Sequence, residues 1–190
     1  MNKARRRTAV TIGVMTLFAV IILVFYYYLE NRVPSGEETS VQNMTETEKI
    51  LAYDLETNYP QTPREAVKLF ARIMRALYND PEEEEIEPLA LKIRGLYDEE
   101  FLSNNLEETY LNNLKEDIAS WKDSGRRITN YLLVNEASEQ EKELEGVKYS
   151  VNYVSYTIQE SGKFTETWKV LLRQDKEKKW KILGWEYVSE

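Results

Sequence analysis

Residues 114–134, LKEDIASWKDSGRRITNYLLV, indicate the fold class, because the spacing of their apolar residues changes at Gly125. Before this glycine, Leu114, Ile118 and Trp121 recur at intervals of three or four residues, which is typical of one face of an α-helix. After it, apolar and polar residues alternate, as they do on a half-buried β-strand. The order predicts helices first and an antiparallel sheet second, which is the α+β class.

Three further helices are predicted before this stretch. The clearest start is residues 62–65, TPRE, where a threonine N-cap, a proline at the first helical position and a glutamate three residues after the cap form a capping box. The residues that follow place an apolar stripe on one face of that helix. The other two are predicted from Thr45 or Thr47 to Asn58 and from Ile86 to Tyr97. The helix that contains Leu114 is itself predicted from about Leu106 to Lys122.

Four adjacent glutamates occupy residues 82–85. Clustered carboxylates can bind calcium, but a calcium loop alternates its acidic residues around a central glycine, and that pattern is missing. The run is therefore interpreted as a solvated acidic turn or helix start. No metal and no other cofactor is predicted.

The C-terminal part of the chain is predicted to be a long antiparallel meander. Apolar positions shift phase near Tyr153 and again at Gly184, which predicts a β-bulge at each place. The charged run 136–146, EASEQEKELEG, is predicted to be an exposed connection. A bent meander needs its concave side filled, and the preceding helices are predicted to pack there. Strands are predicted at 128–135, 147–159, 164–172 and 180–187, with turns at 160–163 and 175–178.

The N-terminal region has the pattern of a membrane anchor. Residues 8–28, TAVTIGVMTLFAVIILVFYYY, hold no charged residue and are long enough to span a bilayer as one helix. Arginines precede the stretch and aromatic residues end it, which predicts a cytoplasmic N-terminus and an extracytoplasmic C-terminal domain. The residues that set this orientation are Arg5, Arg6, Arg7, Tyr26, Tyr27 and Tyr28.

The predicted organisation follows from this anchor. It comprises a cytoplasmic basic segment at 1–7, a transmembrane helix at 8–28, a flexible linker at 29–44 and an extracytoplasmic α+β domain at 45–190. A cleaved signal peptide is the alternative for 8–28, but tyrosines and charged residues stand where cleavage needs small ones. The expected location is the cell membrane, crossed once, so the membrane itself is an expected partner.

Composition excludes several kinds of site. The 190-residue chain has a formal net charge of −8, and an acidic domain repels phosphates, so no nucleic-acid partner is expected. The chain holds no cysteine and no histidine. Their absence removes thiolate catalysis, zinc–thiolate sites and the commonest general base. Any acid–base chemistry is therefore left to Asp, Glu and Tyr.

Three features of residues 45–190 carry a family resemblance: the helix TPREAVKLFARIMRALYN, the helix-to-meander order and the terminal strand KKWKILGWEYV. They resemble the nuclear transport factor 2-like superfamily, which implies a cone-shaped fold with helices packed in a curved antiparallel sheet. The TPRE helix and the segment YNDPEEEE also look like those of uncharacterised membrane-anchored proteins of this type in gram-positive bacteria. Superfamily enzymes usually work with Asp–His or Tyr–Asp pairs, and no residue here matches such a motif.

The predicted sheet is rich in tyrosine and tryptophan. An aromatic cone interior can hold an apolar ligand or a peptide, but alternating aromatic residues are also what half-buried strands are made of, and core packing is the favoured interpretation. Glu166 is in phase with Phe164 and Trp168, and if it points into the cone its pKa would be raised. The candidate pocket-lining residues are Tyr131, Tyr149, Tyr153, Glu166, Trp168 and Trp185.

Three functions fit these observations. The favoured one is a membrane-anchored protein whose extracytoplasmic domain is a noncatalytic binding or assembly module, because the anchor, the acidity and the lack of catalytic residues suit it. The second is a subunit of an envelope secretion or conjugation assembly. The third is an enzyme with a Tyr/Glu acid–base pair in the cone. The partner is an unknown protein or small ligand, and the sequence leaves the oligomeric state open.

Overall fold

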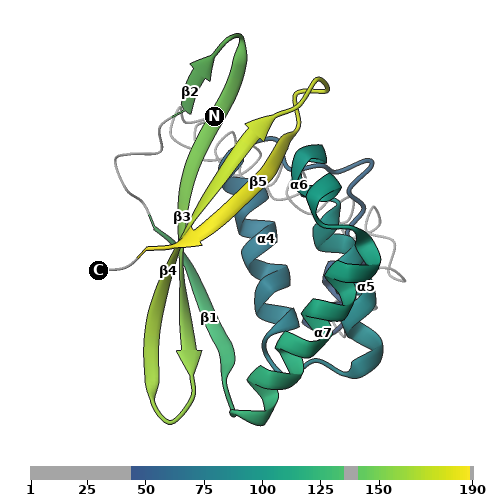
Figure 1. The fold of residues 1–190 in the computed structure, drawn as a ribbon, viewed down its shortest axis with the longest axis vertical. Helices are drawn as coiled ribbons and strands as arrows, with labels where there is room; N and C mark the ends of the chain where they lie inside the picture. The colour runs from purple at the N-terminus through teal and green to yellow at the C-terminus, as the bar shows by residue number, and fades with distance from the viewer. Residues whose placement is uncertain (1–43, 135–140, 189–190) are drawn as a thin grey trace, which may run out of the picture. The chain divides into compact units, whose positions relative to one another are not determined.

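The computed structural model describes residues 44–134 and 141–188, and Thr45–Glu190 form one compact unit of the chain (Figure 1). In this unit the helices lie on one side of an antiparallel sheet, with α4 next to the sheet. The predicted cytoplasmic segment 1–7, the membrane stretch 8–28 and the linker up to residue 43 lie outside the described residues.

The predicted fold class, which began with a membrane-spanning helix, is corrected by the helices that the structure describes. None of them, within 44–134 and 141–188, is long and apolar enough to cross a membrane. The longest is α7 (Glu107–Asp123), whose 17 residues include several charged ones. A spanning helix needs about 20 predominantly apolar residues. The described fold is α+β, with five helices and one five-stranded antiparallel sheet.

Two threonine-capped helices open the described chain. Thr62 accepts a hydrogen bond from the Glu65 N–H at 3.2 Å, and the Glu65 carboxylate accepts from the Thr62 N–H, so the predicted capping box is confirmed. Thr45 makes the same box with Glu48. The helices described are α3 (Glu46–Ala52), α4 (Pro63–Leu77), α5 (Glu83–Arg94), α6 (Glu99–Asn104) and α7 (Glu107–Asp123).

The first helix ends earlier than predicted, at Ala52 instead of Asn58. Tyr53 has an extended backbone, and the Asp54 carboxylate accepts hydrogen bonds from the Glu56 N–H and the Thr57 hydroxyl. An aspartate that binds nearby backbone and side-chain donors in this way offers the chain a turn in place of further helix.

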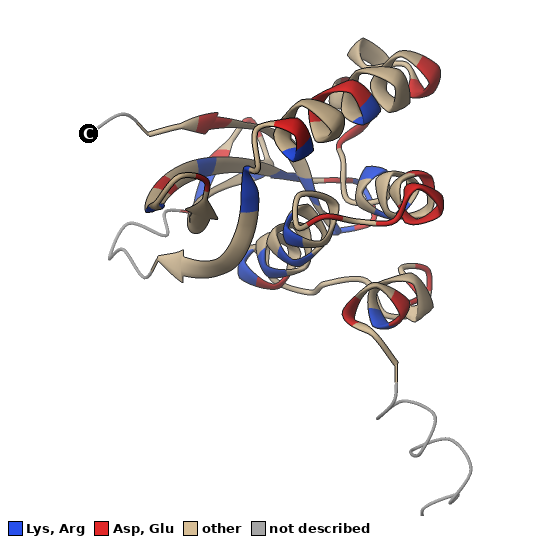
Figure 2. Ribbon diagram, turned by 90° about the horizontal axis from the view of Figure 1, so that it is seen from below, with Lys and Arg blue, Asp and Glu red and all other residues tan. Residues whose placement is uncertain are grey.

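The glutamate run 82–85 is a helix start, as predicted. Glu82 is the N-cap of α5, and the Glu85 carboxylate accepts from the Glu82 N–H at 3.2 Å. Every described helix carries acidic residues in its first turn, and red segments in the ribbon of Figure 2 mark acidic positions along the helices. Negative charge at a helix N-terminus is stabilised by the helix dipole. Among the residues described, no group of three or more carboxylates has the arrangement of a metal site.

The sheet has the strand order β1-β3-β4-β5, and β2 also pairs with β3. The predicted connection 136–146 is wrong in part, because Glu141–Leu144 form a strand whose side chains are all exposed. Glu145 and Gly146 both have positive φ, which allows a tight hairpin with β3. Pairing here rests on backbone hydrogen bonds, so polarity did not prevent it. The strands are β1 (Arg127–Val134), β2 (Glu141–Leu144), β3 (Val147–Gln159), β4 (Lys163–Gln174) and β5 (Trp180–Tyr187).

The bulge predicted near Tyr153 is wrong, whereas the one predicted at Gly184 is confirmed. Residues 149–159 of β3 pair with β4 without a break. The inner face of β3 continues through Asn152 and Ser150, which are buried and hydrogen-bonded to each other at 2.9 Å. Two polar residues on the inner face, not a bulge, cause the apparent phase shift. Between β4 and β5 the register does shift, next to Gly184.

The core lies between α4 and the sheet. Helix α4 packs against β1, β3 and β5, whereas α7 packs against α5. The segment that follows α5 runs along the edge of β5, where the Asp98 N–H donates to the Ile182 carbonyl at 2.9 Å. This arrangement leaves room between α7 and the sheet, and side chains from both line a pocket there.

Candidate ligand-binding pocket

A pocket of about 540 Å³ opens between α4, α6, α7 and β5, and it is called the aromatic pocket below. Its volume lies within the range that small-molecule sites occupy. Its lining combines aromatic rings with amide, hydroxyl and carboxylate groups. The lining residues are Met74, Tyr78, Tyr97, Phe101, Asn104, Asn105, Leu106, Thr109, Tyr110, Asn113, Leu114, Asp117 and Trp185.

The inner wall of the aromatic pocket is a cluster of tilted rings that contact Trp185. The Trp185 ring lies 5.2 Å from Phe70, 5.6 Å from Tyr97 and 5.2 Å from Phe101, measured between ring centroids. Tyr97 also meets Tyr110 edge-on at 6.0 Å. Phe70 and Tyr97 are buried, while the other three rings are half-buried and keep some surface exposed. The cluster therefore joins the core to the pocket.

The outer rim of the aromatic pocket is polar. Thr109, Asn113 and Asp117 follow one another at intervals of four residues, so they lie in a row on one face of α7. The end of α6 contributes the amides of Asn104 and Asn105. An apolar floor with a few polar groups around it is the usual composition of a ligand site.

Tyr78 and Asp117 join the floor to the rim. The Tyr78 hydroxyl donates to the Asp117 carboxylate at 2.6 Å. Burial raises the pKa of the Tyr78 hydroxyl well above its ordinary value, and the hydrogen bond to Asp117 and its charge raise that pKa further. Tyr78 is therefore a neutral hydrogen-bond donor at physiological pH, not a base.

A second pair of tyrosines lies deeper. The hydroxyls of Tyr97 and Tyr110 are 3.2 Å apart, and either one can donate to the other. Burial raises the pKa of both, while the Arg94 guanidinium, 5.1 Å from the Tyr110 ring centroid, opposes the rise. Both hydroxyls are neutral, so this pair also serves as hydrogen-bonding polarity without charge.

The rim is held in place by an ion pair under α6. Asp98 caps this helix by accepting from the Glu100 N–H, and it also binds the Arg173 guanidinium of β4 through two nitrogens. Arg173 contacts Glu100 as well, at 3.1 Å. Asp98 is buried, so the bidentate ion pair satisfies a carboxylate that would otherwise be costly to bury.

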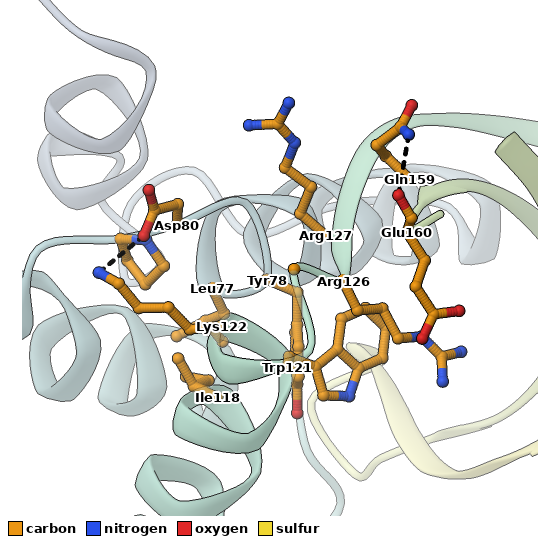
Figure 3. Close-up of a pocket in the computed structure, with 12 residues that line it drawn as sticks. Leu77, Tyr78, Asp80, Ile118, Trp121, Lys122, Arg126, Arg127, Gln159 and Glu160 are labelled. Carbon is orange, nitrogen blue, oxygen red and sulfur yellow. Dashed lines mark hydrogen bonds and ion pairs between the residues drawn. The ribbon is translucent and has the colours of Figure 1, made fainter. Parts of the chain in front are cut away.

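A smaller pocket of about 330 Å³ lies where α7 meets β1, and it shares Tyr78 with the aromatic pocket (Figure 3). Three of its charged side chains are engaged by neighbouring side chains. Lys122 binds Asp80 at 2.7 Å, and the Arg126 guanidinium lies 4.3 Å from the Trp121 ring centroid. These contacts tie α7 to its neighbours and make this pocket a weaker candidate for a ligand.

Three of the six candidate residues lie on the inner face of β4 and β5. Trp185 lines the aromatic pocket, whereas Trp168 is buried between Tyr156 and Tyr187. Glu166 binds Arg126 at 2.5 Å, so its charge is compensated by a guanidinium. This pairing removes the reason for treating Glu166 as an uncompensated base inside the cone.

The other three candidates lie away from the aromatic pocket. Tyr131 packs against the core from β1. Tyr149 and Tyr153 project from the opposite face of the sheet, where they line a groove together with Lys142 and Lys169. Their placement follows from the unbroken alternation of β3, which turns odd-numbered residues away from the helices.

Sequence reasoning missed the helical half of the aromatic pocket, above all Tyr78, Tyr97, Asn113 and Asp117. It looked for ligand contacts on the sheet alone. One signal was present: α7 carries polar residues at 109, 113 and 117, each just before or beside an apolar position of the same helix. A row of polar residues bordering an apolar stripe is typical of a helix whose edge faces a cleft.

The fold and the pocket define an α+β domain with a ligand-sized aromatic pocket between its helices and the end of its sheet. The chain belongs to the family described as Domain of unknown function (DUF6715), whose model matches residues 1–185. Comparison with curated proteins finds no match, and comparison with solved structures finds none either.

Proposed function

We propose that the domain at 45–190 is a noncatalytic binding module that holds a small ligand, or a side chain of a partner, in the aromatic pocket. The observation that carries this proposal is the pocket itself, with rings of Trp185, Phe101 and Tyr110 that keep exposed surface beside a polar rim. Rings needed only for the core are buried completely, as Phe70 is. Partly exposed rings in a concave site gain contact area when a ligand enters.

An enzyme is the second candidate, because the pocket holds a tyrosine and a carboxylate in direct contact. The pair is Tyr78 and Asp117, not Glu166. The raised pKa of Tyr78 makes its hydroxyl a poor proton source and keeps it from acting as a base near pH 7. A hydroxyl in this state orients a bound group, which supports binding over catalysis.

The resemblance to the nuclear transport factor 2-like superfamily, the extracytoplasmic location and the role as an assembly subunit stay predictions. Residues 45–190 have helices beside an antiparallel sheet, which fits the first of them without testing it. The proposed binding function does not depend on any of the three, because it rests on the pocket alone.

The proposal is tested with N-phenyl-1-naphthylamine, a neutral apolar dye that fluoresces when it leaves water. Titration of the purified domain is expected to give saturable binding at one site. Thr109→Trp places an indole on the exposed rim and should weaken dye binding roughly tenfold by filling the pocket. Trp185→Ala should weaken it by a similar factor, through lost ring contact.

Tyr187→Ala is the matched control. Tyr187 stands on the same strand as Trp185, two residues away, and its ring is 64% exposed and outside the lining of the aromatic pocket. Circular dichroism establishes that each variant is folded. Equal dye affinity in the wild type, Thr109→Trp and Trp185→Ala would refute the proposal.

A further inference from the structure

The charge of the aromatic pocket narrows the class of its ligand. The residues that line it, all within the described part of the chain, include no lysine and no arginine. Their only charged side chain is Asp117, which is acidic. The Arg94 guanidinium lies nearby, but it is outside the lining and already binds the Asn105 carbonyl at 2.9 Å and Glu107 at 3.8 Å. A phosphate, a nucleotide or a fatty acid would therefore meet the Asp117 carboxylate with no cation of the lining to balance it, which costs free energy in a partly desolvated site. An acidic ligand is therefore disfavoured.

The rim carries uncharged side-chain groups whose hydrogen-bonding capacity is not fully used by the other described residues. Thr109 and Asn113 are exposed, and their side chains make no hydrogen bond with any described residue. Asn104 and Asn105 donate their amide N–H groups to backbone carbonyls, which leaves each side-chain oxygen able to accept. Amides and hydroxyls both donate and accept, so the rim suits a ligand with several hydroxyl groups.

A cationic ligand is the main competitor, because aromatic rings beside a carboxylate attract quaternary ammonium groups. Two observations speak against it. The Asp117 carboxylate already accepts the Tyr78 hydroxyl, which reduces its pull on a cation. The rim amides and hydroxyls would also have nothing to bind on a quaternary ammonium, which has no donor and no acceptor.

We infer that the aromatic pocket binds an uncharged sugar unit of a glycan. This inference rests on the proposed binding function and names its ligand class. A pyranose ring has one face of C–H groups, which packs on exposed rings such as Trp185 and Tyr110, and a periphery of hydroxyls, which the rim amides bind. The pocket volume of about 540 Å³ has room for one or two such units.

The test is isothermal titration of the purified domain with four probes: cellotetraose, tetra-N-acetylchitotetraose, tetragalacturonic acid and choline. At least one of the two neutral oligosaccharides is expected to bind, with a dissociation constant on the order of 1 mM or below. Tetragalacturonic acid, of the same length but acidic, is expected to bind at least tenfold more weakly than the better neutral one at low salt.

The outcomes separate this inference from the proposed function. If the neutral dye binds and neither neutral oligosaccharide does, the sugar inference is wrong and the binding function stands. If the dye and the oligosaccharides all fail to bind, both are wrong. Binding of choline in place of sugars, or binding of tetragalacturonic acid as tight as that of the neutral oligosaccharides, also overturns the sugar inference.

Two variants on α7 locate the sugar. Asn113→Leu removes a rim amide and should weaken oligosaccharide binding roughly threefold to tenfold, the range expected for one lost hydrogen bond, while dye binding is unchanged or tighter. Asn112→Leu is the matched control, since Asn112 is the exposed neighbour outside the pocket lining. Equal losses in both variants, or no loss in Asn113→Leu, would place the sugar elsewhere and contradict the inference.

Discussion

Helices α4 and α7 both belong to the helical layer of the domain, but they differ in how many of their residues are buried. Eight of the fifteen residues of α4 are buried, whereas only Leu114 and Ile118 are buried among the seventeen of α7. Helix α4 closes the core against β1 and β3. Helix α7 rests on α5 and leaves its polar edge along the aromatic pocket. One helix thus supplies stability and the other supplies a binding surface.

Core and site are therefore divided between two helices in this domain, and not between helices and sheet. A helix that faces a pocket needs fewer apolar residues, because the ligand or water covers what the protein does not. Substitutions in the two helices and around the pocket test this difference.

The largest effect is expected from Ile73→Ala on α4. Ile73 is fully buried, so truncation removes apolar contacts and leaves a sealed cavity, lowering the free energy of unfolding by about 3–4 kcal/mol. The matched change on α7 is Ile118→Ala, expected to cost only about 2 kcal/mol because Ile118 borders the smaller pocket and its site is open on one side. Urea denaturation measures both. Equal losses would break the contrast between the two helices.

The next largest loss of stability is expected at the base of α6, which carries part of the pocket rim. Asp98→Ala removes the α6 cap and leaves Arg173 without its buried partner, which should cost about 2–3 kcal/mol. Hydrogen exchange should speed up in α6 while α4 keeps its protection. Glu100→Ala is the control, because Glu100 is an exposed partner of the same arginine and should cost under about 1 kcal/mol. Faster exchange in α4 as well would show that the rim and the core unfold together.

A smaller effect is expected where α7 ends. Gly125 has a φ of +67°, and a Cβ there would meet nothing within 4 Å, so Gly125→Ala is penalised by backbone conformation alone. The expected loss is about 1–2 kcal/mol. Gly162→Ala is the matched control, because its Cβ also meets nothing and its φ is not in the left-handed region, so thermal unfolding should barely change. Similar losses in both variants would rule out the conformational explanation.

The smallest effect on stability is expected at the contact between α3 and α4, where Glu46 binds Arg72 at 2.5 Å. The hydrogen bond from Arg72 lowers the pKa of Glu46 despite some opposing burial. A lowered folded-state pKa gives stability that is complete above the ordinary glutamate pKa and is lost as the pH falls through the lowered value. Glu46→Gln should therefore cost under about 1 kcal/mol at pH 7, and nothing at pH 2.

This prediction is measured by comparing urea midpoints of wild type and Glu46→Gln from pH 7 down to pH 2. The two curves should converge at the acidic end. A difference that stays constant with pH would mean that the Glu46 carboxylate contributes through packing and not through its charge.

Much of the fold was predictable because its signals are local. The capping box at Thr62, the end of α7 before Gly125 and the turn between β3 and β4 each depend on a few neighbouring residues. The candidate site was not predictable in the same way. Of the six sheet residues proposed to line a pocket, Trp185 lines the aromatic pocket, and Tyr149 and Tyr153 line a groove on the other face.

The helix starts, the change from helical to alternating periodicity and the acidic, cysteine-free and histidine-free composition follow directly from the order of the residues. The folded chain, and no local pattern, brings Tyr78 at the end of α4 to Asp117 of α7 and Asp98 to Arg173. It also turns Ser150 and Asn152 inward. The reason is physical. Periodicity and capping act over a few residues of one element. A pocket forms where side chains from elements far apart in the sequence converge, and a pattern within one element does not show which of these side chains will meet.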